Sequence, residues 1–377
     1  MEGLLRRAII NTDMRNIYKR SQTGIIKEVL NDPDRKPVFL MFRELMALWW
    51  YYREIPVHYV GRYLFKYDAV NIFDYVPNRL SGQIAPFFND ARLKQVLDNK
   101  LYFYLFYNQF GINTPNIVAF NHRSLIASGG ETTTVDSVND FRDLLSNLFN
   151  KHRDCDTLFL KKIYSSSSGR NIIIIPAEYA ENETPELNVL FREVVGSEFI
   201  FQPGVHQHPG LNRLNPSSLN TIRFDTFIDR DGKIEIISGF LKMSTNNLAV
   251  DNNTSGGCGV GIDLDEGTLR DNGYSKIKMS GVGILKEHPV TGVRFGGFVV
   301  PMLEEAKALV IKAAALMPGL RLIGWDVGIG ESGPVLIEGN SDYGVNSNDL
   351  MYGGYMANST FRKMLHEMNY KLKEHKI

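Results

Sequence analysis

Apolar residues recur at helical spacing in the clearest stretches of this chain. Between residues 89 and 110, one face is built by leucines four positions apart: Leu93, Leu97, Leu101 and Leu105. Gly111 follows as a stop signal, so the pattern predicts one helix over 89–110. Residues 301–317 carry a second apolar stripe, which Pro318 and Gly319 end, and they predict a second amphipathic helix.

Other stretches alternate between apolar and polar positions in the manner of β-strands. Residues 219–228 and 233–242 flank an Asp-Arg-Asp-Gly turn, which predicts a hairpin. Residues 322–329 and 334–337 flank the turn 330–333, which has glycine at both ends, and predict another hairpin. Together with a mainly helical N-terminal region, these strands predict an α+β fold.

The second predicted hairpin brings three oxygen-bearing side chains together. If it centres on Ser332, Asp326 and Glu338 stand opposite each other, and Asn340 shares their face because strand side chains alternate. Like charges in that position destabilise a bare hairpin, and oxygen ligands suit Mg²⁺. The pattern therefore predicts a cation site, while a solvated hairpin with incidental acids explains the spacing equally well.

Composition narrows the class of protein. The 377 residues are 44% hydrophobic and 22% charged, which is typical of a globular protein. Lys plus Arg equals Asp plus Glu, at 42 each, so nothing indicates nucleic acid as the main partner. Cys155 and Cys258 are the only cysteines, which excludes a disulfide framework and suits a reducing, cytoplasmic setting. No apolar run reaches about 18 residues and no signal-peptide pattern occurs, so we expect no transmembrane segment.

Three further segments stand out by composition. The serine-rich loop at 165–169, flanked by Lys161 and Arg170, is either a phosphate-binding loop or flexible surface. The glycine-rich stretch at 250–261 indicates close approach of the backbone to a ligand or neighbour. Residues 38–67 are rich in aromatic side chains, which fill a helical core in the favoured interpretation and dock on a membrane surface or a partner in the other.

Taken in order, these pieces resemble the ATP-grasp fold, and in particular the sugar-transfer-associated ATP-grasp proteins. The resemblance runs from about residue 97 to 340 and rests on these segments: 97–100 with 111–115, 159–162 with 165–169, 199–205, 220–223, 250–257, and 324–326 with 338–340. Each motif alone is weak, but their joint order and spacing are specific. The resemblance implies a helical N-terminal region (1–110), a lid subdomain (111–200), and a C-terminal subdomain with the metal site and a terminal helix (201–377).

The resemblance also implies ATP and Mg²⁺ as cofactors. The implied nucleotide-binding residues are Lys100, Lys161, Ser166, Ser167, Ser168, Gly169, Gln202 and Val205. The two lysines would bind phosphates, the serine loop would close over the nucleotide, and the backbone of 199–205 would hold adenine. The implied Mg²⁺ ligands are Asp326, Glu338 and Asn340.

Two departures from the family pattern bear on the roles of single residues. Many ATP-grasp ligases carry an arginine where this chain has Gly324, so we assign the γ-phosphate arginine to Arg223. A proline commonly stands where this chain has Lys162, which leaves open whether Lys161 or Lys162 faces the nucleotide, with alignment favouring Lys161. The predicted catalytic residues are thus Arg223 and Lys161. The predicted substrate-binding residues are Arg223, Asp251, Asn252, Gly256 and Gly257, of which Asp251 and Asn252 equally suit a turn.

The resemblance implies an ATP-dependent ligase that phosphorylates a carboxylate, so that an amine, or a thiol or hydroxyl, attacks the acyl-phosphate. Its partners would be small molecules, an amino acid or other carboxylate and an amino sugar or amine, in surface polysaccharide assembly. The alternative is a kinase on the same fold or a nucleotide-binding accessory to a glycosyltransferase. For His206 and His208, a loop-structuring role is favoured over contact with substrate. The sequence does not indicate an oligomeric state.

Overall fold

The computed structural model describes residues 22–164, 172–181, 184–245, 257–275 and 283–370. Of the residues assigned from sequence, these lie outside the described ranges: Ser166, Ser167, Ser168, Gly169, Arg170, Asp251, Asn252 and Gly256. Contacts divide the chain into two compact units. Unit 1 includes Gln95–His206 and Val335–Glu338, and unit 2 includes Lys19–Lys94, Gln207–Pro334 and Gly339–Ile377. The functional division at residues 110 and 200 stays a prediction.

Unit 1 is built on a six-stranded antiparallel sheet with the strand order β3-β2-β1-β6-β4-β5. Its strands are β1 (Ala119–His122), β2 (Leu125–Ser128), β3 (Glu131–Thr134), β4 (Thr157–Lys162), β5 (Ile172–Pro176) and β6 (Phe199–Pro203). Its helices are α6 (Gln95–Asp98), α7 (Lys100–Gln109), α8 (Val138–Lys151), η3 (Ala177–Ala180) and α9 (Pro185–Val195). The β-branched run of β5, four consecutive isoleucines, is typical of a strand.

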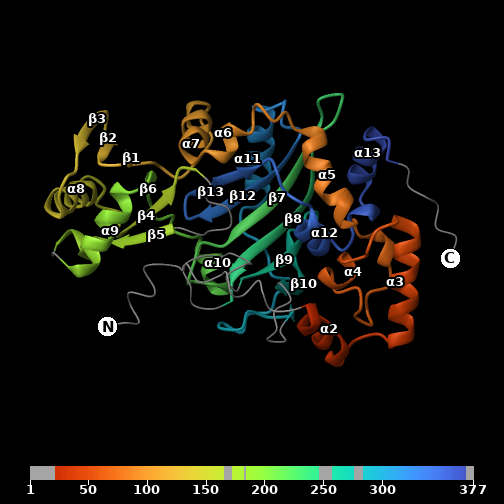
Figure 1. The fold of residues 1–377 in the computed structure, drawn as a ribbon. Coiled ribbons are helices and arrows are strands. Elements are labelled where there is room, and N and C mark those ends of the chain that lie inside the picture. Colours follow the sequence, from red (N-terminus) through yellow and green to blue (C-terminus); the bar gives the residue numbers. More distant parts are fainter. Residues whose placement is uncertain (1–21, 165–171, 182–183, 246–256, 276–282, 371–377) are drawn as a thin grey trace. The chain divides into compact units, whose positions relative to one another are not determined.

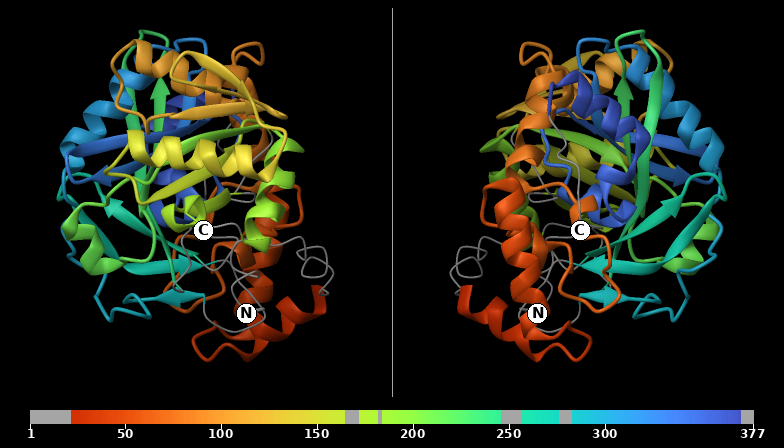
Figure 2. Two further views of the ribbon diagram at one scale, coloured as in Figure 1. Left: turned by 90° about the vertical axis from the view of Figure 1, so that its left-hand side faces the viewer. Right: turned by 90° about the vertical axis from the view of Figure 1, so that its right-hand side faces the viewer.

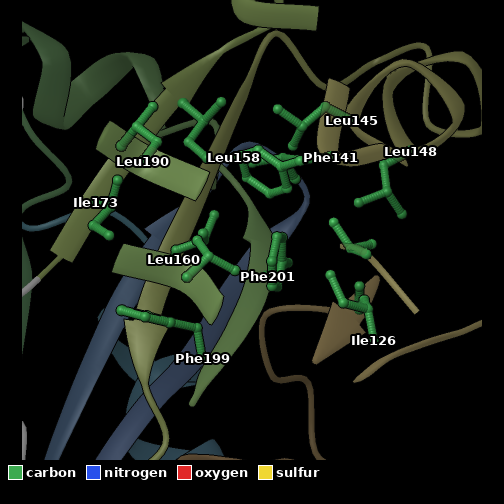
Figure 3. Packing of buried hydrophobic residues seen from close by; sticks show 14 of the residues in the cluster. Ile126, Phe141, Leu145, Leu148, Leu158, Leu160, Ile173, Leu190, Phe199 and Phe201 are labelled. Carbon is green, nitrogen blue, oxygen red and sulfur yellow. The ribbon is translucent and has the colours of Figure 1, made fainter. Parts of the chain in front are cut away.

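One face of this sheet forms the core of unit 1 against α8 and α9. β4 turns Leu158 and Leu160 into this core, and α8 contributes Phe141, Leu145 and Leu148 from one helical face. Figure 3 shows these side chains pointing toward one another between the strands and the helix. The core therefore decides which face of β4 is covered by helices.

Unit 2 holds a seven-stranded sheet with the order β11-β10-β9-β8-β7-β12-β13, to which unit 1 residues 335–338 contribute part of β13. The strands are β7 (Thr221–Ile228), β8 (Ile234–Ser244), β9 (Gly257–Asp263), β10 (Thr268–Ser275), β11 (Ile284–Leu285), β12 (Leu322–Gly330) and β13 (Gly333–Asn340). Figures 1 and 2 show the long strands β7 and β8 in green and β12 in blue, and the register makes β8, β7 and β12 neighbours.

The helices of unit 2 come from the N-terminal quarter and from the second half of the chain. They are α2 (Gln22–Asn31), α3 (Val38–Tyr52), α4 (His58–Gly61), η2 (Ile72–Asp74), α5 (Asn78–Phe88), α10 (Pro209–Leu214), α11 (Leu303–Ala315), α12 (Asn346–Tyr352), η4 (Tyr355–Ala357) and α13 (Ser359–Glu367). α11, which confirms the helix predicted over 301–317, packs on β7, β8 and β12. Within the described ranges, no helix has the length and apolarity that crossing a bilayer requires.

Both predicted hairpins are confirmed. The strands at 219–228 and 233–242 are β7 and β8, which pair antiparallel. The strands at 322–329 and 334–337 are β12 and β13, joined through Glu331 and Ser332. That Asp326 and Glu338 stand opposite each other across this hairpin stays a prediction.

The single helix predicted over 89–110 is wrong, because Asn99 separates α6 from α7. The Asn99 side chain accepts hydrogen bonds from the backbone N–H groups of Leu101 and Tyr102 and thereby caps α7. The backbone N–H of Lys100 donates to the carbonyl of Ile163, which ties the start of α7 to the end of β4. The leucine spacing continues through the break, so periodicity alone could not locate it.

The interpretation of the aromatic segment 38–67 as a helical core is confirmed for some of its residues and wrong for others. Tyr59, Tyr63 and Phe65 are buried together, so the core interpretation is confirmed for them. Trp49 and Trp50 of α3 are exposed, so the core interpretation is wrong for this pair.

Candidate functional site

Three neighbouring strands of unit 2 place polar side chains on one face. In the register of β7 with β12, Arg223 lies opposite Asp326. In the register of β7 with β8, Thr221 lies opposite Lys242. Because residues two apart in a strand share a face, Arg223 and Thr221 bring Asp326 and Lys242 to the same side of the sheet.

Asp326 is the charged centre of this face. Arg223 holds it through two parallel bonds, 2.6 Å from Nε to Oδ1 and 2.9 Å from Nη2 to Oδ2. The Nζ atom of Lys242 lies 2.9 Å from Oδ2. Only 3% of the Asp326 side chain is exposed, and a buried carboxylate persists only when it is paired and hydrogen-bonded. The two cations therefore fix the position of Asp326 and are fixed by it.

Gly324 provides the space that Arg223 occupies. A Cβ atom at this position would lie 3.0 Å from Nη1 of Arg223 and 3.2 Å from the ring of Tyr343. The guanidinium carbon of Arg223 lies 5.9 Å from the centroid of the same ring. A side chain at position 324 would therefore crowd the Arg223 guanidinium and the Tyr343 ring.

A second carboxylate, Asp225, is fully buried on β7, the strand that carries Arg223. The hydroxyl of Tyr355 donates to Oδ2 of Asp225 at 2.8 Å, and Ser238 contacts the same hydroxyl. Burial raises the pKa of Asp225 to about 6, although the Arg223 charge and the Tyr355 hydrogen bond act in the opposite direction. Asp225 therefore gains its charge in the native state at a higher pH than an exposed aspartate does.

In unit 1, Lys100 pairs with Glu338. Its Nζ atom lies 3.2 Å from Oε2, and the two side chains are 20% and 34% exposed. An ion pair with this access to water contributes about 0–1 kcal/mol. Either member can therefore exchange its partner for a ligand at little cost.

Strand alternation separates the two lysines of β4. The Nζ atom of Lys162 lies 3.7 Å from Glu193 of α9 and 5.8 Å from the ring centroid of Phe199, on the face covered by helices. Lys161 points to the opposite face together with Phe159. Because α8 and α9 close the first face, this arrangement favours Lys161 as the nucleotide lysine.

The segment expected to hold adenine is the end of β6 and the two residues that follow. Gln202 is buried, and its side-chain amide donates to the carbonyl of Pro115 at 3.1 Å. The backbone N–H of Gly204 donates to the carbonyl of Thr157. The Gln202 side chain therefore anchors the strand, and contact with adenine falls to the backbone of this segment and to half-buried Val205.

The predicted metal ligands Asp326, Glu338 and Asn340 all lie on the β12–β13 hairpin. Asn340 donates through Nδ2 to the carbonyl of Gly324 at 3.3 Å, which leaves its Oδ1 as the acceptor atom. Among the described residues, no cluster of three or more His, Cys, Asp or Glu side chains could hold a metal ion. The donor set is thus two carboxylates and an amide oxygen, a chemistry that fits Mg²⁺.

The two histidines after β6 organise their loop. Nδ1 of His208 accepts a hydrogen bond from the N–H of Gly210 at 3.0 Å and caps α10. Nε2 of His206 lies 3.4 Å from the carbonyl of Asp154. These contacts confirm the loop-structuring interpretation of both side chains.

Sequence reasoning missed Lys242, and the cause is a β-bulge. Near the turn, Ile228 pairs with Ile234. If this register continued along the strands without a shift, Thr221 would pair with Leu241. The bulge shifts the register between Asp225 and Thr226, which pairs Thr221 with Lys242 instead. Only this shift turns the lysine toward Asp326.

The comparisons with known proteins give one family and distant structural likenesses. A family model described as sugar-transfer associated ATP-grasp matches residues 79–362. D-alanyl-alanine synthetase A from Vibrio cholerae is 13% identical to this chain, with a TM-score of 0.42. The match covers 72% of this chain and 64% of the synthetase, so the chain spans less than two thirds of that protein's length. D-cycloserine synthetase is 14% identical with a TM-score of 0.42, over 78% of this chain and 82% of its own. No curated protein matches the chain.

The raised pKa of Asp225 predicts a pH dependence of stability. Between about pH 4 and about pH 6 the native state binds a proton at Asp225 that the unfolded state has released. The free energy of unfolding should therefore fall, relative to Asp225→Asn, as the pH rises through this window, by on the order of 3 kcal/mol. Chemical denaturation of both proteins from pH 4 to 7 measures the difference.

Asp342→Asn, which alters a carboxylate with 63% of its side chain exposed, is the matched control. It should follow the pH dependence of the unchanged protein. Parallel curves for the unchanged protein and Asp225→Asn would contradict the assignment.

Proposed function

Because the chain belongs to the sugar-transfer-associated ATP-grasp family, we propose that it is an ATP-dependent ligase that joins a carboxylate to an amine. The observation that carries the proposal is the buried Asp326 held between Arg223 and Lys242. Such a site supplies fixed charge and no covalent nucleophile, which is what phosphoryl transfer requires. A carboxylate oxygen attacks the γ-phosphorus and ADP leaves. The amine then displaces phosphate from the acyl carbon and loses a proton.

The nucleotide is bound by residues of unit 1 in this proposal. Lys100 and Lys161 bind the phosphates, and the backbone of Gln202 and Val205 holds adenine. The partly exposed Lys100–Glu338 pair supports this role, because a phosphate can replace the carboxylate at little cost. The lid that excludes water from the acyl-phosphate is formed by Ser166, Ser167, Ser168 and Gly169.

Asp326, Glu338 and Asn340 hold Mg²⁺ in the proposed enzyme. Bound Mg²⁺ supplies neutralisation of the charge on the phosphate oxygens. The Arg223 guanidinium is planar and permanently charged, so it stabilises the γ-phosphoryl group and the acyl-phosphate. Its bidentate bond to Asp326 supports this role, because the arginine is oriented before the reaction begins.

We propose small-molecule substrates, an amino acid or other carboxylate and an amino sugar or amine, in a cytoplasmic step of surface polysaccharide assembly. The acceptor pocket is assigned to Gly257 together with Asp251, Asn252 and Gly256. Gly257 is buried at the start of β9 opposite Ser244, where a residue without a side chain permits close approach of a ligand. The family description, which names sugar transfer, supports this setting.

The release of ADP tests this function. Purified protein with ATP and Mg²⁺ is incubated with amino acids and amino sugars, singly and in pairs. A ligase should release ADP when a carboxylate and an amine are both present, because the second substrate completes the turnover. ADP release with one substrate alone would make the protein a kinase. Nucleotide binding without ADP release for any pair would favour a non-catalytic accessory.

The two lysines of β4 should differ in their effect on ATP affinity. Lys161→Ala removes a charged donor to phosphate, a contact worth roughly 1.5–3 kcal/mol, so the Kd for Mg·ATP should rise about 10- to 100-fold. Lys162→Ala is the matched control, since Lys162 lies against Glu193, and it should leave the Kd nearly unchanged. Titration calorimetry measures both values, and the reverse pattern would transfer the role to Lys162.

Arg223→Lys should separate turnover from binding. The variant keeps the positive charge but loses the planar fork, so kcat should fall by about 10² or more while the Kd for Mg·ATP changes little. The assay is ADP release with the most active substrate pair. Arg230→Lys, at the exposed turn between β7 and β8, is the control and should keep full turnover. An unchanged kcat for Arg223→Lys would move the phosphoryl role to another residue.

A further inference from the structure

Helix α3 carries apolar side chains on two opposite sides. Its inner side, with Met41 and Leu48, is buried against Tyr59, Leu64 and their neighbours in unit 2. Its outer side is exposed and consists of Val38, Phe39, Phe42, Met46, Trp49 and Trp50. At 100° per residue these positions form one continuous stripe along the helix. We call this stripe the outer face of α3; Figures 1 and 2 show α3 in red–orange.

The exposure of this face is large for such residues. Phe39 is 78% exposed, Phe42 61% and Trp50 64%. Ile55 and Val57, which follow α3 in the chain, are exposed as well, and so are Ile26 and Leu30 of α2. Apolar side chains gathered in this way mark an interaction surface, whereas scattered ones do not.

The charges on the outer face are of one sign. Arg43 is exposed at the edge of the stripe, beside Trp50 in the helical projection, and Arg53 caps the C-terminus of α3 with its guanidinium carbon 4.1 Å from the centroid of the Trp50 ring. Glu44 is the single acidic residue of α3, and it is turned inward. It accepts hydrogen bonds from Lys36 at 2.8 Å and from the Tyr59 hydroxyl at 2.6 Å. The outer face is therefore apolar and cationic.

We propose that the outer face of α3 docks the protein on an anionic lipid bilayer, with α3 lying in the plane of the interface. Tryptophan and arginine are the side chains that prefer the boundary between headgroups and acyl chains. An interfacial helix combines one apolar face with flanking cations, as α3 does. With 15 residues, α3 lies on the bilayer and does not cross it.

The chemistry of the face favours lipid over a protein partner. An anionic headgroup complements Arg43 and Arg53 whatever its orientation, and each arginine near such a surface strengthens binding about fivefold. The docking is reversible and sensitive to salt, since the screening length shortens from about 10 Å to about 3 Å between 0.1 M and 1 M salt. It requires no nucleotide, so it stands apart from the ligase proposal.

Tryptophan fluorescence tests the proposal directly. The chain has three tryptophans, and Trp325 is fully buried in β12, so a spectral change reports on Trp49 and Trp50. Vesicles of phosphatidylcholine with phosphatidylglycerol are added to the full chain, and vesicles of phosphatidylcholine alone serve for comparison. We expect a blue shift of emission and co-sedimentation with the anionic vesicles, both reduced in 1 M salt.

Two double variants and a control complete the test. Phe39→Ser with Phe42→Ser should weaken vesicle binding about tenfold or more, because the apolar contact area is lost. Arg43→Gln with Arg53→Gln should weaken binding to anionic vesicles about 25-fold, at about fivefold for each arginine. Val290→Ser removes an exposed apolar side chain outside α3 and should bind as the unchanged protein does. Circular dichroism confirms that each variant is folded.

Absence of binding to the anionic vesicles would overturn the proposal. Binding that Phe39→Ser with Phe42→Ser leaves unchanged would overturn it as well. A dimer in sedimentation that this variant dissociates, without vesicle binding by the unchanged protein, would show that a second copy of the chain covers the outer face instead.

Discussion

The candidate site depends on one buried charge, the carboxylate of Asp326. Transfer of a carboxylate from water into a protein interior costs several kcal/mol, and pairing must offset this cost. Arg223 supplies the pairing from β7, the neighbour of β12 in the sheet, and Lys242 supplies it from β8, the next strand beyond β7. Their geometry in turn requires the register of β7 with β12 and the bulge that turns Lys242 to the same face. A local irregularity of one strand thus brings the second cation to the buried charge.

Ion pairs also balance the acidic side chains of the β12–β13 hairpin. Asp326 has two cations beside it, and Glu338 has Lys100. In the proposed enzyme, Asp326 and Glu338 would hold Mg²⁺, and Lys100 would bind a phosphate in place of Glu338. Gly324 is part of this arrangement, since a side chain there would crowd the Arg223 guanidinium. The glycine at this position and the arginine on β7 therefore belong together.

The sequence predicted the features that depend on local patterns. The hairpins around 229–232 and 330–333 and the helix at 301–317 follow from strand alternation, turn residues and helical periodicity, and all are present. The alternation of β4 also distinguishes Lys161 from Lys162 once the covered face is known. Features that interrupt a repeating pattern, or that depend on which face is covered, were missed. The Asn99 cap interrupts a continuous leucine pattern, the bulge reverses the face of Lys242, and the aromatic segment divides into a core and an exposed face.

The proposed function requires that the acidic hairpin bind Mg·ATP, and titration calorimetry of Glu338→Gln measures this requirement. The substitution preserves the shape of a partly exposed side chain and removes the charge that would balance Mg²⁺. Glu331→Gln, at the exposed turn of the same hairpin, is the control. We expect the unchanged protein and the control to bind ATP tightly only with Mg²⁺, and Glu338→Gln to weaken this binding about tenfold or more. Equal affinity of Glu338→Gln and the unchanged protein for Mg·ATP would contradict this requirement.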